Sequence, residues 1–273
     1  MLPWIKKNPL FFYFLMSMLI SWSIELPLVA AAQGWTSARV PFSIHYLASF
    51  GPMLSAFLTT ALVSGRAGLK ELFQRIARWR VGSRWVAFSF LSPFVLFLIA
   101  AGVNALATGS WPDLARLGEV NYLPNLGAGV FLLWLATFGL GEEIGWRGFA
   151  LPRLQKNHTA FSATLILGVL WMVWHLPAFF YHETYLNMEW FLVPGMLVGL
   201  LFGGVLLTWL YNSTEGSIIM VAIWHALFDL LSASKGSGER VAPVMTAGVI
   251  FLAIRILRVH GPEHLSTKEK QTL

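Results

Sequence analysis

Long apolar runs separated by short polar loops repeat along the whole chain of 273 residues. A helix needs about 20 mostly apolar residues to cross the hydrocarbon core of a bilayer. Eight runs approach this length, and they cover residues 9–32, 43–64, 85–108, 127–145, 161–181, 190–211, 215–234 and 241–259. The pattern therefore predicts an all-α polytopic membrane protein with about eight transmembrane helices.

The composition supports this class and excludes several others. Hydrophobic residues make up 56% of the chain and charged residues only 12%, whereas soluble domains carry about 25% charged residues. The chain has no cysteine, which excludes disulfides, thiolate metal ligands and a cysteine nucleophile. The net charge of +6 reflects basic loops, so we expect no nucleic-acid partner.

The basic residues predict the orientation of the chain in the membrane. Alternate loops place 15 of the 19 Lys and Arg residues on one side. Because cytoplasmic loops carry this excess, we expect both termini in the cytoplasm. Residues 66–84 have basic residues interleaved with apolar residues at helical spacing, which predicts an amphipathic connector on the cytoplasmic leaflet.

The chain is expected to form one transmembrane domain over residues 1–262, with its candidate chemistry in 127–234. The polar tail 263–273 is expected to be disordered. The first apolar run is longer than the core of a signal peptide and contains Glu25, so an uncleaved span is favoured there. No role is predicted for Glu25 or for His45.

Two adjacent carboxylates, Glu142 and Glu143, lie at the end of the fourth apolar run. An ionisable group in hydrocarbon costs about 2.5–3.5 kcal/mol, so it usually has a partner or a function. Glu143 and Arg147 are four residues apart and would form an ion pair on one helix face. Glu142 points about 100° away and would remain available as a general base. A helix-end ion pair without catalysis is the alternative.

Two further pairs have the same spacing. Trp171 and His175 lie in the fifth run, directly before Pro177, which removes a backbone donor and interrupts the helix. His225 and Asp229 lie in the seventh run, where the aspartate could accept a hydrogen bond and orient the imidazole. Each pair alone could be structural.

Together, Glu142, His175 and His225 could form one water-activating site. Two histidines and one glutamate are also a known ligand set for catalytic zinc, so Zn²⁺ held by Glu142, His175 and His225 is an open alternative to a metal-free glutamate mechanism. The chain has no His-Glu-x-x-His sequence and no Gly-x-Ser-x-Gly elbow. A zincin-type site and a serine nucleophile therefore have no support.

The series Glu142-Glu143-x-x-x-Arg147, Trp171-x-x-x-His175 and His225-x-x-x-Asp229 resembles the motifs of the CPBP family. This family groups the type II CAAX prenyl endopeptidases with bacterial bacteriocin-processing and self-immunity proteins. The stretch Glu142-Glu143-Ile144-Gly145-Trp146-Arg147-Gly148-Phe149 is close to the bacterial form of the first motif. The first 120 residues resemble the family only in that they contain membrane spans and a basic connector.

The resemblance implies an eight-helix intramembrane endopeptidase with a cavity open to the cytoplasm. By position, Glu142 and His175 would activate water, and Glu143 and Arg147 would support the site. His225 and Asp229 would stabilise the oxyanion or complete the site. The sequence departs from the family pattern at Trp171, where Phe is usual, and at Asp229, where Asn is common. An ionised aspartate only accepts hydrogen bonds, so the favoured role of Asp229 is to orient His225.

The resemblance implies that the partners are the lipid bilayer and a membrane-associated peptide or protein substrate. If the source is bacterial, as the first motif indicates, the location is the plasma membrane and a prenylated substrate is not favoured.

Two other functions remain open. A non-proteolytic membrane factor could bind peptide or confer immunity in the same cavity, and a proton-coupled transporter could use the Glu, His and Asp side chains as a relay.

Overall fold

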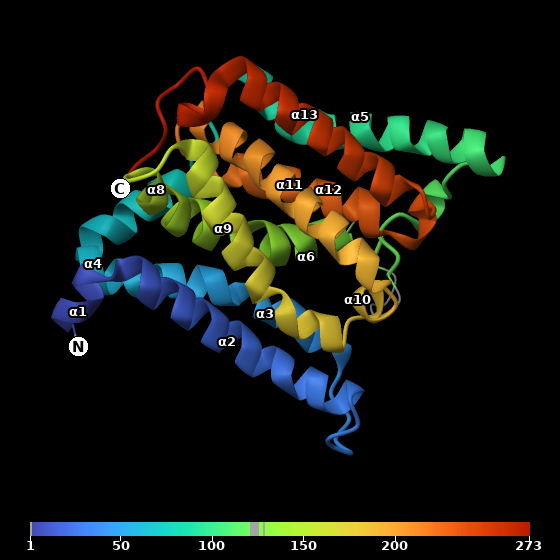
Figure 1. The fold of residues 1–273 in the computed structure, drawn as a ribbon, viewed down its shortest axis with the longest axis horizontal. Coiled ribbons are helices and arrows are strands. Elements are labelled where there is room, and N and C mark those ends of the chain that lie inside the picture. Colours follow the sequence, from blue (N-terminus) through green and yellow to red (C-terminus); the bar gives the residue numbers. More distant parts are fainter. Residues whose placement is uncertain (1, 121–125, 128) are drawn as a thin grey trace.

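The computed structural model describes residues 2–120, 126–127 and 129–273, and within these ranges the chain is all helical (Figure 1). The α-helices are α1 (Leu2–Lys7), α2 (Pro9–Ala32), α3 (His45–Ala48), α4 (Phe50–Ile76), α5 (Ser83–Thr108), α6 (Gly129–Trp134), α7 (Glu143–Gly145), α8 (Leu151–Gln155), α9 (Ala160–Trp174), α10 (Glu183–Leu186), α11 (Val193–Ser213), α12 (Ile218–Ala233) and α13 (Val241–His264). Two π-helical segments are η3 (Leu135–Glu142) and η4 (Trp146–Ala150). Short 3₁₀ segments are η1 (Phe42–Ile44), η2 (Leu114–Arg116), η5 (Leu176–Phe180), η6 (Trp190–Leu192) and η7 (Lys235–Ser237).

The all-α membrane class predicted from the sequence is confirmed. In the described part of the chain, 6 helical stretches are long and apolar enough to cross a membrane. The expected span 127–145 is instead a succession of α6, η3 and α7, and the expected span 215–234 contains α12, which has 16 residues. Eight crossings therefore remain a prediction.

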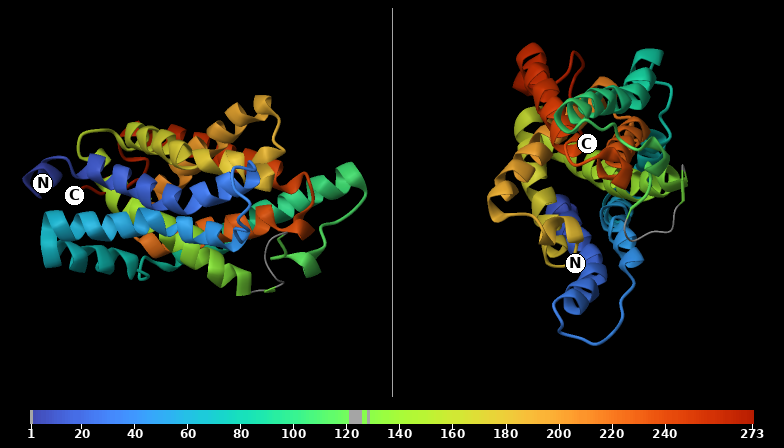
Figure 2. Two further views of the ribbon diagram at one scale, coloured as in Figure 1. Left: turned by 90° about the horizontal axis from the view of Figure 1, so that it is seen from below. Right: turned by 90° about the vertical axis from the view of Figure 1, so that its right-hand side faces the viewer.

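Both termini lie at the same end of the bundle (Figures 1 and 2). At that end α2 begins, α4 ends and α13 ends. This arrangement agrees with an even number of crossings. The cytoplasmic location of this end remains a prediction.

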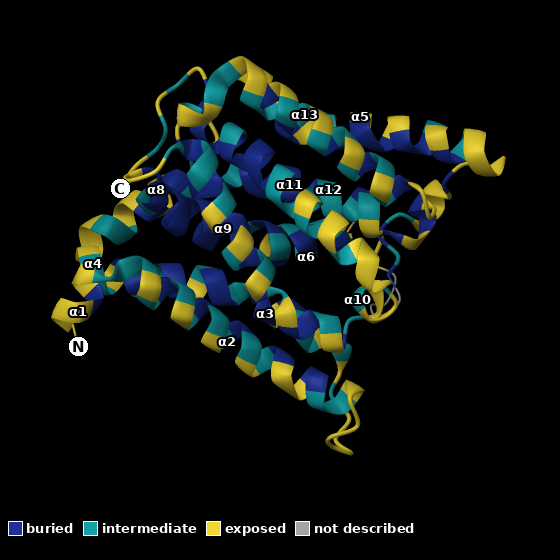
Figure 3. Ribbon diagram, in the orientation of Figure 1, coloured by how far each residue is buried: buried dark blue, intermediate teal, exposed yellow. Residues whose placement is uncertain are grey.

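The outward faces of the long helices carry large apolar side chains. On α5, Leu98 is 62% exposed and Ile99 is 58% exposed, and exposed positions recur along the outer helices (Figure 3). A soluble monomer rarely exposes so much contiguous apolar surface. These faces are therefore suited to contact with lipid.

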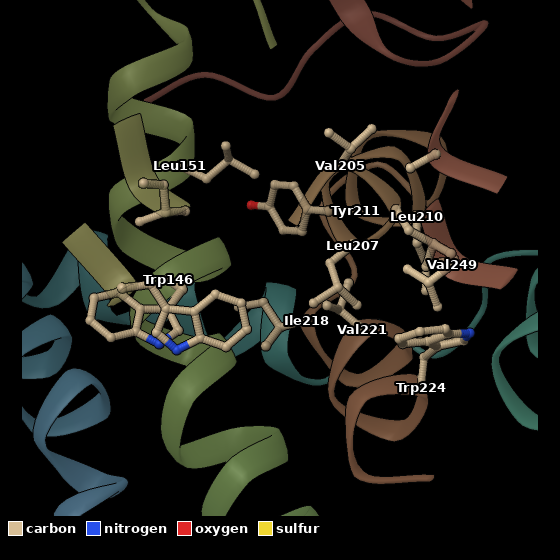
Figure 4. Packing of buried hydrophobic residues seen from close by; sticks show 14 of the residues in the cluster. Trp146, Leu151, Val205, Leu207, Leu210, Tyr211, Ile218, Val221, Trp224 and Val249 are labelled. Atoms are coloured by element: carbon tan, nitrogen blue, oxygen red, sulfur yellow. The ribbon is translucent and has the colours of Figure 1, made fainter. Parts of the chain in front are cut away.

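The main apolar cluster combines residues of the segment carrying the first motif with residues of α11, α12 and α13. Residues 141–152 are all buried, without interruption. Trp146 and Leu151 from this segment belong to one apolar cluster with Tyr211 of α11 and Trp224 of α12 (Figure 4). The position of this segment is thus stabilised by side-chain packing at the centre of the bundle.

Glycines allow this segment to lie directly against the backbone of its neighbours. A Cβ added to Gly139 would lie 2.8 Å from the carbonyl oxygen of Ala222 in α12, and one added to Gly145 would lie 2.7 Å from the carbonyl carbon of Pro52 in α4. Real Cβ atoms do not approach a backbone this closely. The first motif is therefore held between α4 and α12 by contacts that only glycine permits.

The C-terminal tail, for which the sequence predicts disorder, lies along the bundle in the structure. The buried Gln155 and Asn212 side chains bond to each other, and both also bond to the backbone of Gln271. Ser266 bonds to Ser213 at 3.0 Å. These bonds satisfy side-chain groups at the end of α11 that would otherwise be buried without partners.

Candidate active site

Glu142 ends η3 and is almost fully buried. Its Oε2 atom accepts hydrogen bonds from two indole N–H groups, that of Trp171 at 2.9 Å and that of Trp146 at 3.3 Å. Among the described residues, no hydrogen bond to Oε1 is present. The indoles therefore fix the carboxylate and leave one oxygen for a water molecule or substrate.

Glu143 is in a different environment from its neighbour. Its side chain is 0% exposed, and Oε1 accepts from Arg147 Nη1 at 2.9 Å and lies 2.8 Å from His225 Nδ1. The predicted ion pair with Arg147 is therefore present. Arg147 also packs over the ring of Trp171, with its Cζ atom 5.0 Å from the ring centroid. Glu143 thus links the first motif to α12, while the arginine links it to α9.

His175 lies directly after the last residue of α9, where Leu176 begins the 3₁₀ segment η5. The helix ends here, two residues before Pro177. His175 Nδ1 lies 2.8 Å from the carbonyl oxygen of Trp171. A carbonyl only accepts, so Nδ1 carries the hydrogen and donates it. In the neutral ring, this leaves the lone pair on Nε2, which can accept a proton.

His225 lies between two carboxylates. Its Nδ1 atom bonds to Glu143, and its Nε2 atom is 3.6 Å from Asp229 Oδ2. The sequence predicts that Asp229 orients this ring, but the short hydrogen bond from the ring is accepted by Glu143. Since ionised carboxylates only accept, the ring can donate to both only as an imidazolium, in which both nitrogens carry hydrogens.

One cavity of about 760 Å³ brings the three motifs together. Glu142, His175, His225 and Asp229 all line it. Glu143 and Arg147 lie behind this surface and are buried. The lining also includes Gly199 and Gly203 of α11 and Thr246 of α13, together with apolar side chains. A peptide could thus reach the acidic and imidazole groups at one wall of a largely apolar chamber.

The candidate zinc ligands do not form a metal site in this arrangement. Both nitrogens of His225 face carboxylates, and the bonded oxygen of Glu142 faces two indoles. Within the described ranges, no three His, Asp or Glu side chains are grouped so that they could hold a metal ion. Zinc dependence remains a prediction.

The sequence did not identify every polar group of the cavity. Trp146 and Trp171 supply the hydrogen bonds to Glu142, and the bond from Trp171 joins residues 29 positions apart. Glu25 and His45 line the same cavity, and each lies within 2.8 Å of the Tyr181 hydroxyl. In the sequence, only the position of Glu25 and His45 inside apolar runs indicates that these two residues have polar partners.

Comparison with known proteins agrees with the motifs. Residues 124–231 match the family model described as type II CAAX prenyl endopeptidase Rce1-like. The chain is also 25% identical over 233 residues to a protein of Methanococcus maripaludis named CAAX prenyl protease 2, an alignment that covers 80% of this chain and 84% of the relative. The matched segment contains all three motifs and the elements that position them. Residues 124–231 are thus similar to the Rce1-like type II CAAX prenyl endopeptidases, which supports the resemblance to the CPBP family that the three motifs carry.

Proposed function

We propose that this chain is an intramembrane endopeptidase in which Glu142 and His175 activate water to hydrolyse a peptide bond of a membrane-associated peptide or protein. One observation carries the proposal: four candidate catalytic side chains, from η3, from the residue that follows α9 and from α12, line a single cavity. Similarity to a protease family supports the same class of activity.

The two activating groups have complementary geometry. Glu142 keeps Oε1 for a water proton because its Oε2 atom accepts both indole bonds. His175 presents Nε2 because its Nδ1 atom bonds to the Trp171 carbonyl. The water oxygen would attack the peptide carbonyl carbon while its proton passes to Glu142. The same proton would then move to the amide nitrogen as the C–N bond breaks, returning the carboxylate to its starting state.

His225 is the proposed stabiliser of the tetrahedral intermediate. As an imidazolium it offers a positive charge to the developing oxyanion, and its Nε2–H, which makes no short hydrogen bond because Asp229 lies 3.6 Å away, can donate to it. Glu143 holds Nδ1 at 2.8 Å and Arg147 in turn holds Glu143. Asp229, at 3.6 Å from Nε2, balances the charge of the ring at the cavity wall. Glu143 and Arg147 are thus positioning residues.

The test is cleavage of membrane peptides by the purified protein in detergent. Wild type should produce defined fragments, whereas Glu142→Ala and His175→Ala should each lose about 10²–10⁴-fold in rate. Cleavage that survives both substitutions would refute the catalytic assignment. Specific binding without any cleavage by wild type would favour the non-proteolytic peptide-binding or immunity factor, and ion-driven proton uptake would favour the transporter.

Metal dependence can be measured on the same sample. Because both nitrogens of His225, one of the three candidate ligands, face carboxylates, we expect less than a stoichiometric amount of zinc by elemental analysis. Activity should also survive prolonged treatment with a chelator. Stoichiometric zinc, together with activity that is lost on chelation and restored by zinc, would contradict the metal-free mechanism.

A further inference from the structure

A second polar cluster lies on the cavity wall formed by α2. The Tyr181 hydroxyl donates to Glu25 Oε1 at 2.8 Å and lies 2.6 Å from His45 Nδ1. Glu25 belongs to α2 and His45 to α3, and Tyr181 follows η5. Glu25 and His45 line the cavity, but none of the three belongs to the motifs of the first site. The reaction proposed above does not use them.

Glu25 is a buried carboxylate whose charge has no ionic counterpart. Its side chain is 2% exposed, and its Oε2 atom has no hydrogen-bond partner among the described residues. No ion pair of Glu25 occurs in that part of the chain, whereas Glu143 contacts both Arg147 and His225. Burying a carboxylate is costly unless it is paired. A cationic ligand in the cavity would supply the missing partner.

The surroundings of Glu25 favour a positive ligand. The described lining of the cavity includes four carboxylates, those of Glu25, Glu142, Glu183 and Asp229. Its cationic side chains are the exposed Lys235 of η7 and His225, whose imidazolium already lies between Glu143 and Asp229. His182 packs against His45 with ring centroids 5.2 Å apart. Burial lowers the pKa of His182 to about 4, so at neutral pH its ring adds no positive charge that would repel a cation.

Two hydrogen bonds between α2 and the end of α9 place the cluster close to His175. Trp174 Nε1 donates to Ser21 Oγ at 2.7 Å, and Trp22 Nε1 donates to the Trp174 carbonyl at 3.0 Å. Glu25 follows Ser21 by four residues on α2, which places it on the same face about 6 Å further along the helix. An extended peptide advances about 3.3 Å per residue. The span from His175 to Glu25 therefore corresponds to a few residues of bound substrate.

We propose that Glu25 forms a substrate subsite that binds a lysine or arginine side chain located one to three residues from the scissile bond. The unpartnered Oε2 atom accepts from the cation, while Tyr181 holds Oε1 in place. This subsite rests on the proposed function, because it assumes that a peptide occupies the cavity. It adds a preference for basic residues that the catalytic groups alone do not require.

The test measures binding separately from cleavage. The protein carrying Glu142→Ala, in which cleavage is silenced, is titrated with labelled membrane peptides that differ only by lysine or norleucine at one position. At one or two positions near the scissile bond, lysine should improve the dissociation constant by about tenfold or more, as expected for a buried charge pair. Adding Glu25→Gln should bring the two peptides within about twofold of each other.

Two controls make the outcome specific. Glu239→Gln, on an exposed loop outside the cavity lining, should leave the lysine preference intact. Retained binding of the norleucine peptide would show that Glu25→Gln still folds. Equal binding of both peptides at every position, or a lysine preference that survives Glu25→Gln, would overturn the subsite. A lysine preference without any cleavage by wild type would count against the peptidase and leave the subsite standing.

Discussion

Adjacent residues with the same side chain, Glu142 and Glu143, have different environments in this protein. Because successive residues of a helix point in different directions, Glu142 faces the cavity and Glu143 lies behind it. The first is held by two indole N–H groups and the second by an arginine and a histidine. One carboxylate is thus placed for chemistry and the other for support.

The sequence predicted the pair of Glu143 and Arg147, because a spacing of four residues is a local property of a helix. It did not predict that Glu143 bonds to His225, which is 82 residues away. It also assigned the orientation of His225 to Asp229, the neighbour at helical spacing. Contacts that depend on how helices pack are not encoded in the local spacing, and this limited the prediction of the site.

Replacing Arg147 by alanine should strongly destabilise the protein. The substitution would leave Glu143, which is fully buried, without its arginine. Removing one partner of a buried ion pair costs about 3–5 kcal/mol. The measurement is thermal unfolding of the purified protein in detergent, where the midpoint should fall well below that of wild type.

Arg116→Ala is the matched control for this prediction. Arg116 also pairs with a glutamate, Glu119, but both side chains are partly exposed. Exposed pairs contribute about 0–1 kcal/mol, so this midpoint should change little. Equal losses for the two arginine variants would contradict the account of the buried pair.

At the scale of elements, the first motif lies on a helix that alternates between α- and π-helical turns rather than on a regular span. The sequence predicted one apolar helix over 127–145, of which residue 128 lies outside the described residues. The structure instead has α6, η3 and α7 in succession. Hydropathy measures only how apolar a run is, and it does not detect that Gly139 and Gly145 bring backbones together. The apolar run was predictable, but its irregular form was not.

Gly145→Ala should destabilise the protein and lower its activity. The new Cβ would lie 2.5 Å from Pro52 Cβ and 2.7 Å from the Pro52 carbonyl carbon, so α4 or α7 would have to move. Overpacking of this kind costs about 1–3 kcal/mol, and the displacement would shift the adjacent Glu142 and Glu143. Unfolding in detergent and peptide cleavage are measured together.

Gly102→Ala, in the interior of α5, provides the comparison. Among the described residues, no atom beyond the adjacent backbone of its own helix lies within 4 Å of its added Cβ. Alanine favours a helix over glycine by about 0.5–1 kcal/mol, so this variant should be as stable as wild type or slightly more stable. If Gly145→Ala behaves in the same way, the close approach of α4 is not required.

At the scale of the whole molecule, the apolar runs predicted the helical bundle well. All eight expected runs fall on helical segments of the described chain, although only 6 stretches meet the length and hydropathy needed to cross a membrane. The tail was harder to predict, because its polar composition resembles a disordered segment. Its fixed path depends on Gln155 and Asn212, buried side chains in two distant helices.

The orientation of the bundle can be tested cleanly because the chain has no cysteine. The basic loops predict cytoplasmic termini, so Thr267→Cys in the tail should resist a membrane-impermeant maleimide in intact cells. Ser37→Cys, in the exposed loop between α2 and η1, should react. Both should react after the membrane is permeabilised, and the opposite pattern in intact cells would invert the predicted topology.

The central claim is that Glu142 activates water within this cavity. The most direct test is kcat/KM for one cleaved membrane peptide, comparing wild type with Glu142→Gln, which keeps the shape of the side chain and removes its basicity. We predict a loss of about 10²–10⁴-fold, while Glu239→Gln, outside the cavity lining, retains the wild-type value. A Glu142→Gln protein that is folded and cleaves the peptide at the wild-type rate would contradict the account.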